Sequence, residues 1–278
     1  MNGMNVFVRG LQIDTRYSLQ DIDMIHIQEN VNLKGCTLIF PSVSVGNAAQ
    51  LAVDLLITKI KPQKVGLIWH PAIMPLVGGD PYSLNETALT TSAEVFYSGQ
   101  WKLVIFQIRS PIMQEASQDF VDRITEWIKE NYIDKIVILS GIFDYTRNDS
   151  EIAGPSVKFV ASRTFREKCD VLQRLGDQTA TSGYQTCSVV ICDGSQDPKK
   201  ISMYGGGISW KFFNACNVGG IPAVVLMKYC SEGDNIPDAI LLCTHLNTLL
   251  NFAPSDCNWE SPPSWTGMFG NPPQHGLY

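Results

Sequence analysis

Short apolar runs alternate with stretches of helical periodicity along most of this chain. The clearest unit covers residues 37–58. Residues 37–40 are apolar and partly β-branched, which is typical of a buried strand, and Pro41 ends the strand because it has no N–H to donate. Residues 48–58 carry apolar side chains at helical spacing. The pattern therefore predicts a strand, a tight turn at residues 42–47 and a helix.

The same alternation continues to about residue 253. Further buried strands are expected at residues 64–69, 135–139 and 223–227, a hairpin at residues 94–97 and 102–109, and helices at residues 114–131, 208–216 and 239–252. The pattern of residues 162–175 is compatible with an amphipathic helix and that of residues 189–192 with a strand. Strands that alternate with helices require a sheet covered on both faces. The sequence thus predicts an α/β fold, a three-layer α/β/α domain with a mixed, mostly parallel sheet.

The pattern divides the chain into three parts. Residues 1–30 are weakly patterned and are interpreted as an N-terminal arm, whereas residues 31–253 are expected to form a single α/β domain. Residues 254–278 alternate prolines with large aromatic residues, which excludes a long helix. These aromatic residues are Trp259, Trp265, Phe269 and Tyr278. The tail is expected to be an extended arm whose aromatic side chains bury against the domain or against a partner.

Composition and charge exclude several classes of function. Hydrophobic residues make up 45% of the 278 residues and charged residues 17%, which is typical of a globular protein. The net charge is −6 and the basic residues are scattered, so nucleic-acid binding is not expected. No apolar run is long enough to span a membrane, and no signal-peptide pattern is present. The eight cysteines form no CxxC pair and are interpreted as reduced thiols, and we expect neither a metal nor a cofactor.

The turn at residues 42–47 lies at a strand end, where open α/β sheets bind their ligands. It lacks the G-x-S-x-G, Walker and G-x-G-x-x-G patterns, so we expect Ser44, Gly46 and Asn47 to shape the turn and cap the helix. A nucleoside or ester hydrolase that uses the strand-end residues Ser44, His70 and Ser140 remains an alternative. A third hypothesis is a ligand-binding module that uses the glycines at residues 205–207.

Two charged loops are candidates for contact with a partner. Arg147, Asn148 and Asp149 follow a central strand, and they form either a solvated loop or a contact surface. Residues 231–238 resemble a calcium loop in composition only, and we interpret them as the start of a helix. The candidate residues of this second loop are Glu232, Asp234 and Asn235.

The C-terminal residues Leu277 and Tyr278 are a further candidate site. They place a carboxylate beside an aromatic ring, which would suit an apolar pocket with a lysine at its mouth. The tail therefore adds a possible binding element to the two charged loops.

Taken together, these motifs resemble the proteasome assembly chaperone 2 family. The resemblance covers most of the chain from about residue 35 onward. It rests on residues 40–47, 50–54, 75–82, 93–97, 107–110, 145–149, 205–208, 231–239, 264–265 and 269–270. The VSVGN turn at residues 43–47 and the SEGDNIPDA loop at residues 231–239 are its most specific parts.

The resemblance implies a non-catalytic chaperone. Such a protein would pair with proteasome assembly chaperone 1 as a heterodimer, bind the α-subunit ring of the proteasome core particle, promote its assembly and block premature docking of activators. The resemblance also implies a fold similar to nucleoside phosphorylases and related hydrolases without their active site, and a cytoplasmic and nuclear location. The family's tail ends in a hydrophobic residue, a tyrosine and any residue; here nothing follows Leu277 and Tyr278.

Overall fold

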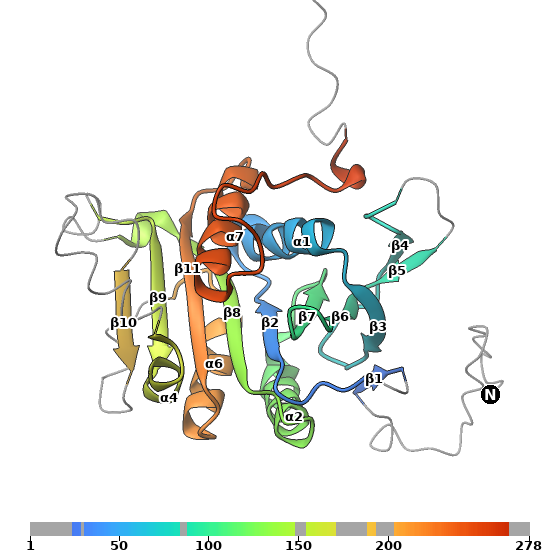
Figure 1. Ribbon diagram of the computed structural model, residues 1–278, viewed down its shortest axis with the longest axis horizontal. Helices are drawn as coiled ribbons and strands as arrows, with labels where there is room; N and C mark the ends of the chain where they lie inside the picture. The colour runs from blue at the N-terminus through green and yellow to red at the C-terminus, as the bar shows by residue number, and fades with distance from the viewer. Residues whose placement is uncertain are drawn as a thin grey trace, which may run out of the picture.

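A nine-stranded mixed sheet forms the centre of the computed structural model (Figure 1), which describes residues 24–28, 31–83, 88–147, 154–170, 188–192 and 203–266. The strand order is β1-β3-β6-β7-β2-β8-β11-β9-β10. The strands are β1 (Ile25–Ile27), β2 (Thr37–Pro41), β3 (Gln63–Ile68), β6 (Ala93–Ser98), β7 (Leu103–Ile108), β8 (Lys135–Phe143), β9 (Val157–Ser162), β10 (Ser188–Cys192) and β11 (Ala223–Cys230). A separate two-stranded sheet consists of β4 (Val77–Gly79) and β5 (Leu89–Thr91).

Parallel pairing occupies the centre of the sheet. β7, β2, β8 and β11 are neighbours and all run in one direction. On one side β6, β3 and β1 add in antiparallel pairs, and on the other side β9 pairs antiparallel with β11 and parallel with β10. The predicted hairpin is β6 and β7. The prediction of a mixed sheet in an α/β/α domain is confirmed.

Helices cover both faces of the sheet. α1 (Ala48–Ile60) and α7 (Ile236–Leu250) lie side by side on one face, and α2 (Ser117–Glu130) and α6 (Ser209–Val218) lie on the other (Figure 1). Side chains alternate along β2: Leu38 and Phe40 join the core under α2 and α6, while Ile39 joins the core under α1 and α7. All three are fully buried, which explains why this strand reads as a continuous apolar run.

Some elements differ from the predicted ones. β8 continues past residue 139 to Phe143, so Ser140 and Gly141 belong to the strand rather than to a loop. β9 was not predicted. The helix expected at residues 162–175 begins as α4 (Arg163–Glu167) and ends there because the chain turns at Lys168, while residues 171–175 lie outside the described part of the chain.

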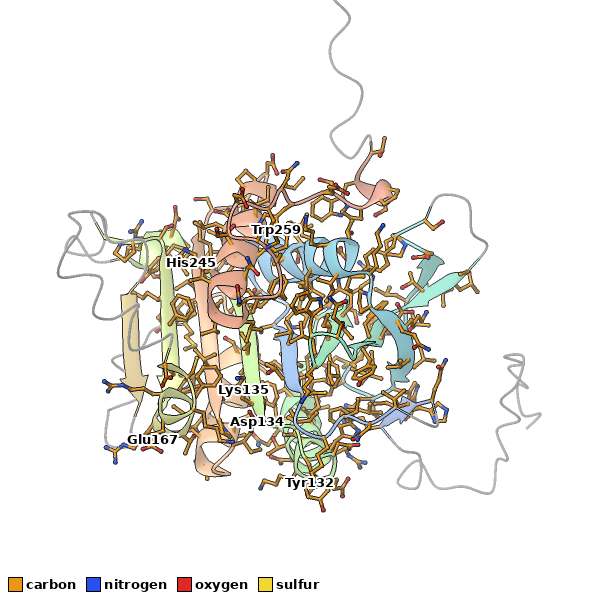
Figure 2. All side chains as sticks on the ribbon, viewed as in Figure 1. Tyr132, Asp134, Lys135, Glu167, His245 and Trp259 are labelled. Carbon is orange, nitrogen blue, oxygen red and sulfur yellow. The ribbon has the colours of Figure 1, made fainter. Side chains whose placement is uncertain are left out.

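The first part of the aromatic tail packs against its own domain (Figure 2). Trp259 is buried, contacts Phe252 edge to face and donates its Nε1 hydrogen to Thr244 Oγ1 at 3.2 Å. Trp265 packs against the same core, and Ser264 N donates to Pro81 O at 3.2 Å. Phe269 and Tyr278 lie outside the described residues.

The described cysteines and His245 lie mostly in the buried core of the domain. The cysteines that the structure describes at residues 36, 169, 216, 230, 243 and 257 are free, and burial raises the pKa of Cys216 and of Cys230 to about 12. His245 of α7 is buried against Phe159, and burial lowers its pKa, as expected for a core histidine. Among the described residues, no helix has both the length and the apolar character needed to cross a membrane.

Phe40 provides a test of the core. Its ring lies 4.8 Å from that of Phe212 and 6.3 Å from that of Phe106, so it joins β2 to β7 and α6. We expect Phe40→Ala to lower the free energy of unfolding by about 3–5 kcal/mol, measured by urea denaturation. Val218→Ala, at a side chain that is 81% exposed, is the control and should change it by less than about 0.5 kcal/mol. Equal effects of the two substitutions would contradict the assigned core.

Candidate functional site

The turn at residues 42–47 lies at the topological switch point of the sheet. After β2 the chain enters α1 on one face, whereas after the neighbouring parallel strand β7 it enters α2 on the opposite face. Connections that leave two adjacent parallel strands in this way open a crevice at the carboxyl ends of those strands, where α/β proteins bind their ligands. The turn therefore lies at the strand end where the sequence placed it.

The chain's own backbone occupies this position. The glycine loop, residues 203–207, lies against the turn: Val45 N donates to Gly205 O at 2.9 Å, and Ser42 Oγ donates to Gly206 O at 2.7 Å. Gly207 has a φ of +61°, and a Cβ there would overlap the carbonyl oxygen of Val43. Only glycine permits both the conformation and this close approach. The glycines pack backbone against backbone and leave no cradle for a phosphate at this position.

Ser44 and Asn47 do not cap α1 as expected. Neither side chain accepts a hydrogen bond from the helix N-terminus, and Asn47 is left-handed with a φ of 50°. The Ser44 hydroxyl instead accepts a hydrogen bond from Gly141 N at 2.8 Å, which ties the turn to β8. The prediction that these side chains cap α1 was wrong. The hydroxyl of Ser44 accepts a hydrogen bond from the backbone of β8, which is far away in the sequence, and not from the start of the helix.

His70 has partners other than Ser44. It is buried, its Nε2 lies 2.8 Å from Asp119 Oδ2, and its Nδ1 accepts a hydrogen bond from Ala72 N at 3.0 Å. The hydrogen bond from His70, followed by the charge of Arg123, lowers the pKa of Asp119. Both ring nitrogens are therefore engaged: Nε2 fastens the segment after β3 to α2, and Nδ1 holds the turn within that segment. The described residues contain no hydrogen-bonded pair of Ser44 and His70 that would form a nucleophile and its base.

A polar cavity lies at the same end of the sheet, beyond β8 and β11. Its volume is about 260 Å³, and its lining residues are Asp144, Arg147, Ser156, Lys228, Tyr229, Ser231, Glu232, Asp234, Asn235 and Asp238. The two charged loops singled out in the sequence thus meet here, although they are far apart along the chain. The side chain of Asn235 also lies 2.6 Å from where a Cβ of Gly46 would be, so the cavity adjoins the turn.

The cavity is held together by contacts within and between its loops. Lys228 Nζ lies 2.8 Å from Asp238 Oδ1, and Asn235 Nδ2 donates to Ser231 O at 2.9 Å and to Asp238 Oδ2 at 2.8 Å. The guanidinium of Arg147 lies over the Tyr229 ring at 4.8 Å. Pro237 and Asp238 stand in the first turn of α7, as predicted for a helix start. Asn148, Asp149, Leu277 and Tyr278 lie outside the described residues.

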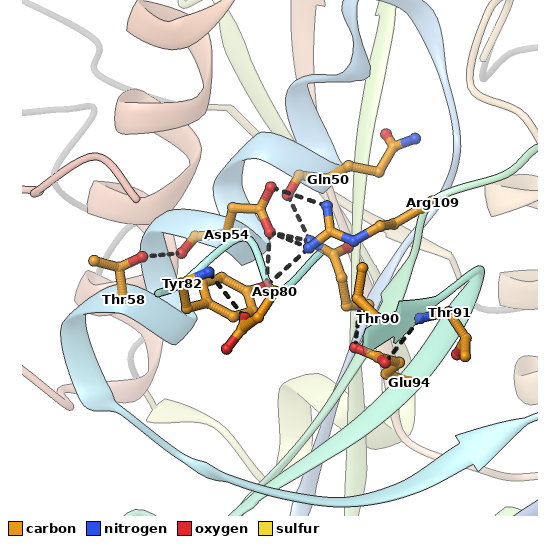
Figure 3. A network of polar contacts seen from close by, with 10 residues as sticks. Gln50, Asp54, Thr58, Asp80, Tyr82, Thr90, Thr91, Glu94 and Arg109 are labelled. Carbon is orange, nitrogen blue, oxygen red and sulfur yellow. Dashed lines mark hydrogen bonds and ion pairs between the residues drawn. The ribbon is translucent and has the colours of Figure 1, made fainter. Parts of the chain in front are cut away.

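A buried polar cluster was missed by the sequence analysis (Figure 3). Asp54 of α1 is only 4% exposed, and its carboxylate is surrounded by donors. It accepts hydrogen bonds from Tyr82 Oη at 2.7 Å and Gln107 Nε2 at 2.6 Å, and from a guanidinium nitrogen of Arg109 at 3.0 Å. Burial opposes the charge of Arg109, yet the opposite charge of Asp54 raises its pKa; burial and then Asp54 raise the pKa of Tyr82 well above its usual value.

A second buried carboxylate, Glu94 of β6, lies near this cluster. It accepts hydrogen bonds from Thr90 Oγ1 at 2.8 Å and Thr91 N at 2.9 Å, and it pairs with Lys64. Glu94 therefore fastens β5, while Asp54 fastens the loop after β4 through Tyr82. The signal in the sequence was a charged residue inside an otherwise apolar helix or strand, which is rarely buried without partners.

The fold and the site define a protein of the α/β class whose strand-end turn packs against a glycine loop. Its similarity to known proteins shows the family. Residues 38–256 match the model of the PAC2 family, and the chain belongs to this family. Proteins named proteasome assembly chaperone 2 are similar over most of their length. The protein from Xenopus laevis is 33% identical over 84% of this chain and 92% of its own, that from Danio rerio 34% over 86% and 94%, and that from Homo sapiens 30% over 86% and 94%.

Solved structures share the fold. PbaA of Pyrococcus furiosus, described as an archaeal homologue of proteasome-assembly chaperone, has a TM-score of 0.60 at 15% identity, with 88% of this chain and 92% of PbaA covered. PbaB of the same organism, described as an archaeal proteasome activator, has a TM-score of 0.54 at 15% identity, with 83% and 89% covered.

Removing the Ser44 hydroxyl should cost stability. In Ser44→Ala the buried Gly141 N–H loses its acceptor, and we expect the free energy of unfolding to fall by about 1–3 kcal/mol in urea denaturation. Ser255→Ala, at an exposed residue, is the matched control and should change it by less than about 0.5 kcal/mol. An unchanged midpoint for Ser44→Ala would show that this hydroxyl does not fasten the turn.

Substitution of Asp54 should lower the free energy of unfolding more than substitution of Ser44 does. Asp54→Asn leaves the half-buried charge of Arg109 without its counter-ion, so we expect a loss of about 3 kcal/mol. The double substitution Asp54→Asn/Arg109→Met should cost less than the sum of the two single substitutions, because the pair is coupled. Asp122→Asn on the exposed side of α2 is the control. Additive single effects would contradict a direct interaction.

Proposed function

We propose that this protein is a non-catalytic chaperone of proteasome assembly. It acts as a heterodimer with proteasome assembly chaperone 1, binds the α-subunit ring, promotes assembly of the core particle and blocks premature docking of activators. Its place of action is the cytoplasm and the nucleus. The observation that carries this proposal is the family membership, with relatives named proteasome assembly chaperone 2 that match along nearly their whole length.

The geometry of the strand-end turn supports a role without chemistry. Residues 203–207 pack directly against the strand-end turn, at the end of the sheet where an α/β enzyme would hold its substrate. Ser44 and His70 form hydrogen bonds with other groups, and Ser140 Oγ donates to Gly206 O at 3.2 Å. The three residues of the hydrolase alternative are thus engaged in structural contacts. The same contacts of Gly205 and Gly206 speak against a ligand-binding role for the glycine loop.

Purification of the tagged full-length chain from its own cells tests the proposal. We expect α-type proteasome subunits and a second α/β chaperone to be recovered in stoichiometric amounts. A tagged variant without Leu277 and Tyr278, the proposed contact with the α ring, should no longer recover the α-type subunits but should still recover the second chaperone. Recovery of this protein only as a free monomer, under conditions where other assembly factors stay bound, would contradict the proposal.

The C-terminal pair is the proposed contact with the α ring. Deletion of Leu277 and Tyr278 removes an apolar side chain and an aromatic ring, so affinity for purified core particle should fall about ten- to a hundredfold. Tyr278→Phe keeps the aromatic ring and should lose much less. Surface plasmon resonance gives both values. Unchanged affinity after the deletion would remove the tail from the proposal and leave the chaperone role to other surfaces.

A further inference from the structure

A second cavity lies between the end of α1 and the two-stranded sheet of β4 and β5. Its volume is about 330 Å³, and its apolar lining residues are Ile57, Pro62, Tyr82, Ala88, Leu89 and Phe96. Leu89 is 64% exposed although its side chain is entirely apolar. The cavity is therefore an apolar hollow on the surface of the domain, and exposed apolar surface of this kind is typical of a binding site.

Two aromatic rings in the wall of this cavity are held in place. Tyr82 and Phe96 pack edge to face, with ring centroids 5.9 Å apart and an interplanar angle of 88°. Phe96 is 4% exposed, and the hydroxyl of Tyr82 donates to Asp54 Oδ1 at 2.7 Å (Figure 3). A further aromatic ring packs well against such a pair. The cavity is thus preformed for an aromatic side chain.

The charges around the cavity balance one another. Two lysines, Lys61 and Lys64, and two carboxylates, Asp80 and Glu94, line it. Lys64 forms an ion pair with Glu94. The lining therefore carries no net charge, and an uncharged occupant fits it best.

The C-terminal segment leads directly to this cavity. It crosses α1, where Lys59 Nζ donates to Asn258 O at 3.2 Å, and it reaches the loop after β4, where Ser264 N donates to Pro81 O at 3.2 Å (Figure 1). Pro81 stands between Asp80 and Tyr82, which both line the cavity. The described part of the segment ends two residues later, at Thr266. The chain therefore leaves the described region beside the cavity.

We propose that Phe269 of this chain docks in the cavity. Phe269 follows Ser264 by five residues, which allows a reach of up to about 17 Å from the bond to Pro81. Residues 266–270, TGMFG, carry no charge, so their docking desolvates no ion of the segment. A side chain tethered this close has an effective concentration on the order of millimolar, which favours it over the same side chain from a partner protein.

Docking of Phe269 fixes the point from which the remaining tail starts. Leu277 follows Phe269 by eight residues and therefore lies within about 28 Å of the cavity. The proposed contact of Leu277 and Tyr278 with the α ring is then presented from one place on the surface of the domain. This consequence rests on the proposed function, whereas the docking itself does not.

Methyl NMR spectroscopy of the full-length protein tests the docking. We expect Phe269→Ala to shift the methyl signals of Ile57, Ala88 and Leu89, because the ring current of Phe269 is removed from the cavity. Gln274→Ala, which truncates a side chain further along the same tail, is the control and should leave these signals in place. Unchanged methyl signals in Phe269→Ala, or equal shifts in both variants, would overturn the inference.

Leu89→Asp tests the cavity wall. It places a charge at an exposed position, so the fold should remain, as thermal unfolding verifies, while the apolar contact with Phe269 is lost. Chymotrypsin cleaves after aromatic residues, and we expect it to cleave after residue 269 about tenfold faster than in the unchanged protein, because access follows the undocked fraction. Val218→Asp, at a residue of α6 that is 81% exposed, is the matched control and should cleave at the unchanged rate. Equal rates for Leu89→Asp and the unchanged protein would contradict docking at this cavity.

Affinity for purified core particle is measured separately, so the two proposals can fail independently. Methyl shifts in Phe269→Ala together with unchanged affinity after deletion of Leu277 and Tyr278 would support the docking and refute the α-ring contact of the tail. Unchanged methyl signals together with a loss of affinity after the deletion would refute the docking and support the chaperone proposal.

Discussion

The close packing of the glycine loop against the turn after β2 is the constraint on which the rest of the structure depends. Ser42 Oγ and Ser140 Oγ both donate to Gly206 O, and all three residues are at the carboxyl edge of the central strands. The carbonyl oxygen of Gly206 therefore links the glycine loop to the end of β2 and to β8. Because glycine alone tolerates the backbone at residue 207, this contact holds the turn after β2 and the end of β8 against the glycine loop. The domain has the strand–turn–helix architecture of an α/β fold, and its own glycine loop packs against the turn.

A buried polar group that fastens a loop recurs elsewhere in the domain. Two buried carboxylates fasten β5 and the loop before it. Asp54 accepts a hydrogen bond from Tyr82 in that loop, and Glu94 accepts hydrogen bonds from a hydroxyl and a backbone N–H of β5. Asp238 does the same for the polar cavity through Lys228 and Asn235. A loop fixed in this way loses little entropy when it meets a partner, which favours specific protein–protein contacts. The molecule is organised as a rigid scaffold with preformed surfaces.

The sequence predicted what depends on local pattern. β2, α1 and the hairpin of β6 and β7 were found because their apolar periodicity is strong. The continuation of β8 through Ser140 and Gly141 was missed because small residues resemble a turn, and β9 because a helix follows it at once. Contacts between distant residues were beyond prediction: Ser44 and Gly141 are 97 positions apart, and Asp54 and Arg109 are 55 apart.

For the candidate site residues too, the sequence indicated the local loops but not their contacts with distant residues. Sequence motifs pointed to Arg147, Glu232, Asp234 and Asn235 as separate loops, and only the fold brings them into one cavity. The cluster around Asp54 consists of residues from motifs that carry the family resemblance, at residues 50–54, 75–82 and 107–110. Each member is a polar side chain in apolar surroundings. Their contacts could not be predicted from the sequence because they join a helix, a loop and a strand that only the fold brings together.

The central proposal is that this chain is a non-catalytic chaperone of proteasome assembly. Native mass spectrometry of the full-length protein, mixed with its proposed chaperone partner and freshly refolded α-type proteasome subunits, tests it most directly. The account predicts a discrete complex in which every polypeptide keeps its unmodified mass and in which complete α rings form faster than without the chaperones. Free chains only, or α-type subunits with altered masses, would contradict it.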